Sequence, residues 1–128
     1  MNPAGGPLVD RKTGEAADLV SRFDPEVTYE DTTLPDHAGE TYRGVDGVIR
    51  ATERWIEPFE TMTIDLERIV GTGDCLVSIH RWRATARRTG IAFDEPLAIL
   101  WRFREGNVIH FRSFRDPDEA LEAAGLSE

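Results

Sequence analysis

FDEPLAILWRFREGNVIHFRSFRD, residues 93–116, holds two strand-like runs that flank a turn at residues 105–107. Residues two apart along a strand lie on one face of its sheet. The side chains expected to share a face are Trp101 and Phe103 on the first run, and Phe111 and Ser113 on the second. We expect helices and further strands to gather around this face, so that it forms the wall of a pocket.

The remaining sequence alternates between helical and strand periodicity without any βαβ repeat. The pattern predicts helices at Glu15–Phe23, at Val45–Phe59 and after Asp116, and strands at Glu26–Thr32, Thr61–Val70 and Leu76–Arg88. Long strands joined by short turns favour antiparallel pairing. The predicted fold class is therefore α+β, with a strongly curved antiparallel sheet wrapped around helices.

Composition limits the kind of partner. The chain has 128 residues and a net charge of -9, and such an acidic domain is a poor match for nucleic acid or an anionic membrane surface. No apolar run approaches the length of a membrane span, and Cys75 is the only cysteine. We expect a cytoplasmic protein with a flexible Gly/Pro-rich segment at residues 1–13 and a single domain at residues 14–128.

Several segments together resemble one known superfamily. They are FDPEVTYEDT, TYRGVDGVIRATERWI, VGTGDCLVSIHRWRATARRTG, LWRFREGNVIHFRSFRD and DEALEAAGL. Their order and spacing are similar to the SnoaL-like and ketosteroid-isomerase-like branch of the nuclear transport factor 2-like (NTF2-like) superfamily. The resemblance implies a cone-like barrel with an internal apolar pocket, a homodimer, a small apolar ligand and no cofactor. It does not specify an activity, because one fold hosts many functions.

Asp31 is the first candidate catalytic residue. It shares a predicted strand face with Val27 and Tyr29, and in the VTYED context it matches the carboxylate that shuttles a proton in ketosteroid isomerases. Burial disfavours the charged form of a carboxylate and makes it a stronger base. The alternative is a strand-end Asp that bonds backbone amides of the following loop.

His80 is the second candidate, on the predicted inner face of the strand Leu76–Arg88. A histidine there can exchange a proton near neutral pH, or it can be a core histidine whose hydrogen bonds are satisfied by a neighbour. The other expected pocket-lining residues are Tyr29, Trp55, Trp82, Ile99, Trp101, Phe111 and Ser113. The histidines are too scattered in predicted facing to propose a metal site.

Two positions depart from the better-known relatives. Ile99 stands where ketosteroid isomerases carry a protonated acid, and Ser113 stands where limonene-type epoxide hydrolases carry an acid. The chain also has no tyrosine before Tyr29 to serve as the isomerases' oxyanion donor. These departures argue against both activities, since oxyanion stabilisation is usually the largest catalytic term.

Two functions remain open from the sequence. The first is a cofactor-free acid–base enzyme of the isomerase, cyclase or hydratase type, acting on a small apolar cyclic substrate. Asp31 would be its base, and His80 would be its acid or orienting group. The second is a non-catalytic module that binds an apolar ligand or forms a dimer.

Overall fold

A computed structural model of the protein describes residues 22–31 and 40–126. Its elements in chain order are β1 (Phe23–Asp31), β2 (Glu40–Arg43), α2 (Gly44–Ile56), β3 (Phe59–Thr72), β4 (Cys75–Ala86), β5 (Ala92–Arg104), β6 (Asn107–Phe114) and α3 (Pro117–Ala124). The predicted flexible segment 1–13 and residues 15–21 of the first predicted helix lie outside the described residues.

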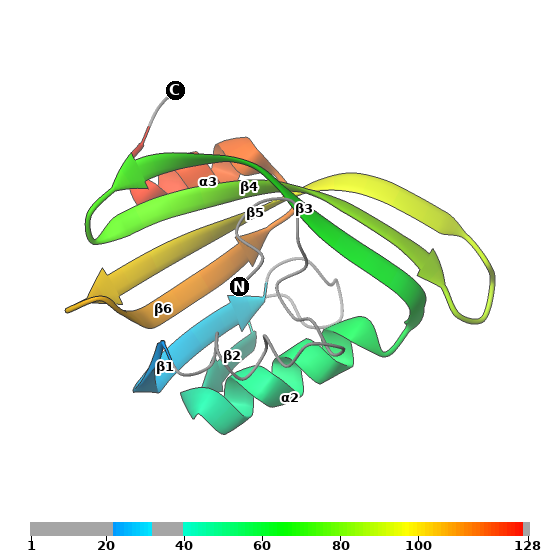
Figure 1. Ribbon diagram of the computed structural model, residues 1–128, viewed down its shortest axis with the longest axis horizontal. Coiled ribbons are helices and arrows are strands. Elements are labelled where there is room, and N and C mark those ends of the chain that lie inside the picture. The colour runs from blue at the N-terminus through cyan, green and yellow to red at the C-terminus, as the bar shows by residue number, and fades with distance from the viewer. Residues whose placement is uncertain (1–21, 32–39, 127–128) are drawn as a thin grey trace.

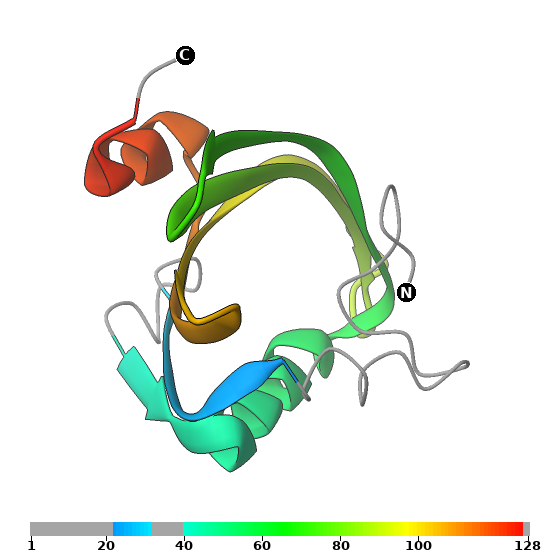
Figure 2. The ribbon, with the colours of Figure 1, turned by 60° about the vertical axis from the view of Figure 1, so that its left-hand side comes forward.

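The six strands form one curved, unclosed sheet in the order β2-β1-β6-β5-β4-β3. Figure 1 shows the long strands β3 to β6 side by side, and Figure 2 shows the sheet bending into an arc that does not close. The predicted curved α+β fold is confirmed. One pairing adds to it: β1 runs parallel to β6, while the other described pairings are antiparallel.

The first strand begins earlier than its sequence pattern predicts. The sequence pattern predicts that Phe23 ends a helix, yet Phe23 opens β1. Its ring stacks on Phe111 at a centroid distance of 5.5 Å. Burial of this aromatic ring against the sheet outweighs the local helical spacing, as tertiary packing commonly does.

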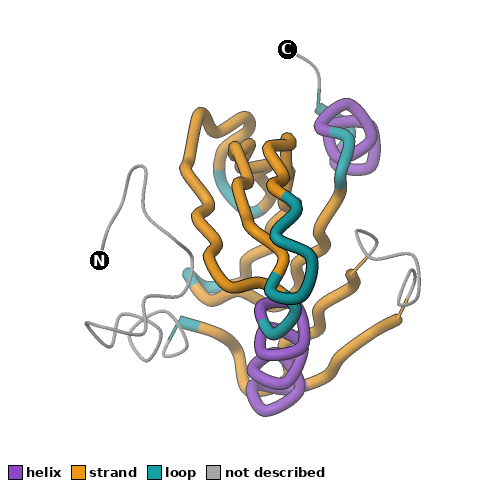
Figure 3. Tube along the Cα trace, turned by 90° about the vertical axis from the view of Figure 1, so that its right-hand side faces the viewer, coloured by secondary structure: helices purple, strands orange, loops and turns teal. Residues whose placement is uncertain are grey.

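Helix α2 follows the predicted apolar stripe and ends earlier than expected. Val48 and Ala51 are buried against the sheet, as a period of 3.6 residues requires. The helix ends at Ile56, because Pro58 cannot supply the backbone N–H of a further turn, and Phe59 already belongs to β3. The tube view in Figure 3 shows α2 and α3 at opposite ends of the molecule.

Helix α3 begins directly after Asp116, as the sequence predicts. The Asp116 carboxylate accepts from the backbone N–H of Asp118, Pro117 occupies the first turn, and Gly125 adopts a left-handed φ of 73°, a conformation that favours glycine. Ala120 and Leu121 pack on the convex face of the sheet with Val77, Ile79, Ala98, Leu100 and Phe114.

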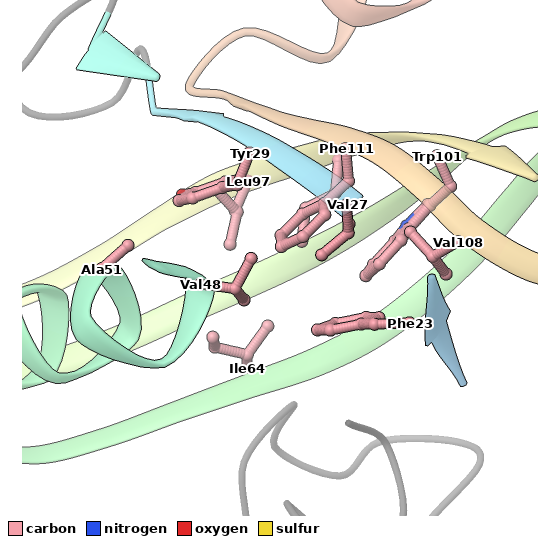
Figure 4. Packing of buried hydrophobic residues seen from close by; sticks show 11 residues of the cluster. Phe23, Val27, Tyr29, Val48, Ala51, Ile64, Leu97, Trp101, Val108 and Phe111 are labelled. Atoms are coloured by element: carbon pink, nitrogen blue, oxygen red, sulfur yellow. The ribbon is translucent and has the colours of Figure 1, made fainter. Parts of the chain in front are cut away.

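The larger core lies on the concave face, between the sheet and α2. Figure 4 shows its side chains meeting from β1, α2, β3, β5 and β6. Its buried members are Phe23, Val27, Tyr29, Val48, Ala51, Ile64, Leu97, Ile99, Trp101, Val108 and Phe111. β4 and β5 therefore have apolar contacts on both faces, so the central strands are the most fully buried part of the sheet.

Replacing Ile79 with alanine tests the packing of α3 on the convex face. Ile79 is only 3% exposed, so Ile79→Ala should lower the free energy of unfolding by about 2–5 kcal/mol through lost contacts and a cavity. Ile69 is 54% exposed, and the control Ile69→Ala should change it by less than about 0.5 kcal/mol. Urea denaturation measures both, and equal losses would contradict the assigned packing.

Candidate functional site

Four side chains from four neighbouring strands form one row across the concave face. The register pairs Asp31 with Ser113, Ser113 with Ile99, and Ile99 with Ser78. Residues directly opposite each other in a sheet project to the same side. All four are buried, so three polar groups and one apolar side chain lie in a line within the core face.

Asp31, Tyr29 and Ser113 gather at one end of this row. The Tyr29 hydroxyl and Ser113 Oγ lie 2.8 Å apart in a buried hydrogen bond. Burial raises the pKa of Tyr29, and the nearby Asp31 charge raises it further. Asp31 itself is 3% exposed. The tyrosine therefore stays protonated at neutral pH, beside a carboxylate that the fold removes from bulk water.

A second polar cluster centres on Ser78 of β4. Trp101 Nε1–H donates to Ser78 Oγ at 2.7 Å, and Ser78 Oγ is also 2.7 Å from His80 Nε2. His80 is 5% exposed, and burial lowers its pKa from 6.5 to about 4. The imidazole is thus neutral at physiological pH and cannot serve there as an imidazolium acid.

Aromatic rings lie on both sides of the polar row, before and after it along the strands. Phe111 stacks on Tyr29 at 4.4 Å and on Trp101 at 5.0 Å between ring centroids. Trp82 contacts Trp55, Phe59 and Phe93 at centroid distances of 5.8, 5.2 and 5.7 Å. Such pairs add to area burial and leave flat apolar walls.

The predicted site residues therefore fall into three groups. Tyr29, Asp31 and Ser113 lie together on β1 and β6, His80 and Trp101 meet through Ser78, and Trp55 contacts Trp82. Ile99 lies in the row between Ser113 and Ser78. Asp31 and His80 belong to strands with β6 and β5 between them.

Sequence reasoning missed two charged residues on the same face. Glu95 lies opposite Trp82 in the register, and Arg115 donates to Glu95 Oε1 at 3.0 Å. Both follow from period-two spacing: Glu95 precedes Leu97, Ile99 and Trp101, and Arg115 follows Phe111 and Ser113. Ser78, the centre of the second polar cluster, precedes His80 by two residues, so the same spacing places it on this face.

Within 22–31 and 40–126, no group of three or more His, Cys, Asp or Glu side chains is placed to hold a metal ion. In the same part of the chain, no helix has the length and apolar character needed to cross a membrane.

The curved six-stranded sheet, with one of the described helices on each face, defines an NTF2-like fold. The sequence also matches the model of the SnoaL-like domain over residues 11–111, and the chain belongs to that family. Comparison with curated proteins finds no match.

Solved structures similar to the chain share this fold. A protein from Jannaschia sp. CCS1 that is described as a SnoaL-like polyketide cyclase aligns with a TM-score of 0.71 at 18% identity, over 91% of this chain and 82% of its own. An NTF2-like protein from Burkholderia thailandensis E264 aligns with a TM-score of 0.69 at 25% identity, over 91% of both chains. TerC, co-crystallised with polyporic acid, aligns with a TM-score of 0.66 at 18% identity, over 82% of this chain and 81% of its own.

Burial of neutral His80 makes stability depend on pH. The pKa of His80 is 6.5 in the unfolded chain and about 4 in the folded chain. The stability that neutral His80 contributes is therefore fully present above pH 6.5 and is lost as the pH falls toward 4. From about pH 7.5 to about pH 5, wild type should lose roughly 2 kcal/mol more unfolding free energy than His80→Gln. Denaturation at both pH values measures the difference, and equal losses would contradict the depressed pKa.

The Tyr29–Ser113 hydrogen bond should couple β1 to β6. In a double-mutant cycle with Tyr29→Phe and Ser113→Ala, we expect a coupling free energy of about 0.5–1.5 kcal/mol. A cycle that pairs Tyr29→Phe with Ser78→Ala serves as the control, since Ser78 bonds Trp101 and His80 instead. Additive effects in the first cycle would show that the bond contributes nothing measurable.

Proposed function

We propose that the chain is a small-molecule enzyme that uses Asp31 as a general base on a cyclic, largely apolar substrate. The observation that carries this proposal is the burial of the Asp31 carboxylate on the concave face, beside Tyr29 and Ser113. A carboxylate withdrawn from bulk water in an aromatic environment is well suited to take a proton from carbon.

The reaction class that fits is proton abstraction next to a carbonyl, as a step of isomerisation, cyclisation or hydration. Asp31 would take the proton, and the C–H bonding pair would move into the carbonyl to give an enolate. Return of the proton to a different atom, or attack of the enolate carbon on an electrophile within the substrate, would complete the step. Neutral His80 would orient the substrate, because its lowered pKa removes it as an imidazolium acid at neutral pH.

The relatives support the substrate class. Two similar solved structures are described as SnoaL-like polyketide cyclases, and another relative was co-crystallised with polyporic acid. The aromatic walls formed by Phe111, Trp101 and Trp82 suit a flat ring system. We therefore infer a pocket for a cyclic, oxygen-bearing molecule on the concave face.

Hydrogen–deuterium exchange tests the base without knowledge of the natural substrate. In D₂O, the protein should accelerate exchange at the carbon next to the carbonyl of 1-tetralone, a ketone fused to an aromatic ring. Asp31→Asn should reduce this acceleration by about 10²-fold or more, because a general base contributes about 10²–10⁴-fold. Proton NMR follows the loss of the signal.

The matched control is Asp65→Asn. Asp65 is an ion-pair partner of Arg83 with its side chain 39% exposed, so this change should leave exchange unaltered. Undiminished exchange in Asp31→Asn, or no acceleration by wild type, would refute the proposed base.

We further propose that the protein is cytoplasmic, as expected from its composition, and that it is a homodimer, as the family resemblance implies. Native mass spectrometry of the purified chain measures the assembly directly, and a purely monomeric spectrum at micromolar concentration would overturn the dimer.

A further inference from the structure

Two buried ring nitrogens on β4 have no hydrogen-bond partner among the described residues. Within the described chain, His80 Nδ1 and Trp82 Nε1 are both shielded from solvent and make no hydrogen bond. The two residues are two apart on the strand and lie on its concave face, with backbones about 7 Å apart. This spacing lies within the span of one small ligand.

The network around Ser78 assigns the proton of His80. The indole of Trp101 can only donate, so Ser78 Oγ accepts from it. The Ser78 hydroxyl is then satisfied if it donates to His80 Nε2, which leaves the proton of the neutral ring on Nδ1. His80 Nδ1–H is therefore a donor, and Trp82 Nε1–H is a donor by its chemistry.

Leaving such donors unpaired is costly. A buried donor without an acceptor destabilises a fold by about 1–3 kcal/mol, and native structures satisfy most of theirs. Trp101 shows the ordinary outcome, since its indole N–H has a partner. Two adjacent exceptions on one face indicate that the acceptor is supplied from outside the described chain.

The surroundings restrict what that acceptor can be. Trp55, Phe59 and Phe93 pack around Trp82 and favour a flat ring. Glu95 lies opposite Trp82 but its carboxylate accepts from Arg115. With Glu95 and Asp31 on this face and no cationic donor in the pair, a neutral oxygen is favoured over a carboxylate or phosphate.

We propose that His80 Nδ1–H and Trp82 Nε1–H form a binding subsite for the carbonyl oxygen of a ring-bearing ketone. This proposal specifies the ligand class of the proposed function, and it rests on that function for the assignment of the concave face as the binding site. Its test measures binding, whereas the Asp31 test measures proton exchange, so each can fail while the other succeeds.

Paired probes isolate the oxygen. 1-Tetralone and tetralin share a fused ring system, and tetralin lacks the carbonyl. On addition of 1-tetralone to ¹⁵N-labelled protein, the indole N–H cross-peak of Trp82 should move downfield, because the N–H donates a hydrogen bond to the ketone. Tetralin, which has no acceptor, should not cause this downfield shift. The binding constant of 1-tetralone should be stronger than that of tetralin by about tenfold, as one net buried hydrogen bond gives.

Trp82→Phe removes the donor and keeps an aromatic ring. It should abolish the tenfold preference for 1-tetralone over tetralin. The control Trp55→Phe changes a neighbouring ring of the same wall, so it should alter both affinities alike and keep their ratio. Equal affinities in wild type, an unchanged ratio in Trp82→Phe, or no binding of 1-tetralone would overturn the subsite.

The tautomer of His80 supplies a test that needs no substitution. ¹⁵N shifts of wild type near neutral pH should show a protonated Nδ1 and an unprotonated Nε2 at His80. A proton on Nε2 would leave Nδ1 an acceptor, and the proposed pair would then be excluded.

Discussion

Burial of β5 on both faces is the constraint on which the rest of the structure depends. Leu97, Ile99 and Trp101 face the concave core, while Ala98 and Leu100 face the core beneath α3. Both layers require a continuous apolar strand at the centre. The polar groups of the neighbouring strands β4 and β6 therefore enter a region of low dielectric, where their hydrogen bonds and charges have large effects.

That environment gives each polar group a defined state. Tyr29 stays protonated because its ionised form would be buried near Asp31, and His80 stays neutral because its charged form would be desolvated. The concave face thus presents neutral donors alongside one buried carboxylate. Under the proposed function, negative charge that develops on the carbonyl oxygen would be stabilised by neutral N–H and O–H groups, and the carboxylate would act as the base.

Much of this face follows from local spacing in the sequence. Period-two alternation placed Tyr29 and Asp31 together, and likewise Ser78, His80 and Trp82. The same rule would have found Glu95 and Arg115, whose charge disguised their position on an apolar strand face. The short strand β2 was not predicted, because four residues carry too little periodicity to recognise, and the start of β1 depended on a distant aromatic contact.

Side-chain facing and helix caps are thus local properties, set by the backbone geometry of neighbouring residues. The neighbours of each strand are not local. Tyr29 meets Ser113 across 84 positions of the chain, and Trp101 meets Ser78 across 23. The parallel pairing of β1 with β6 has no signature in either strand. Which polar groups acquire partners depends on that long-range order of strands, and so does the lack of a partner within the described residues for the two ring nitrogens on β4.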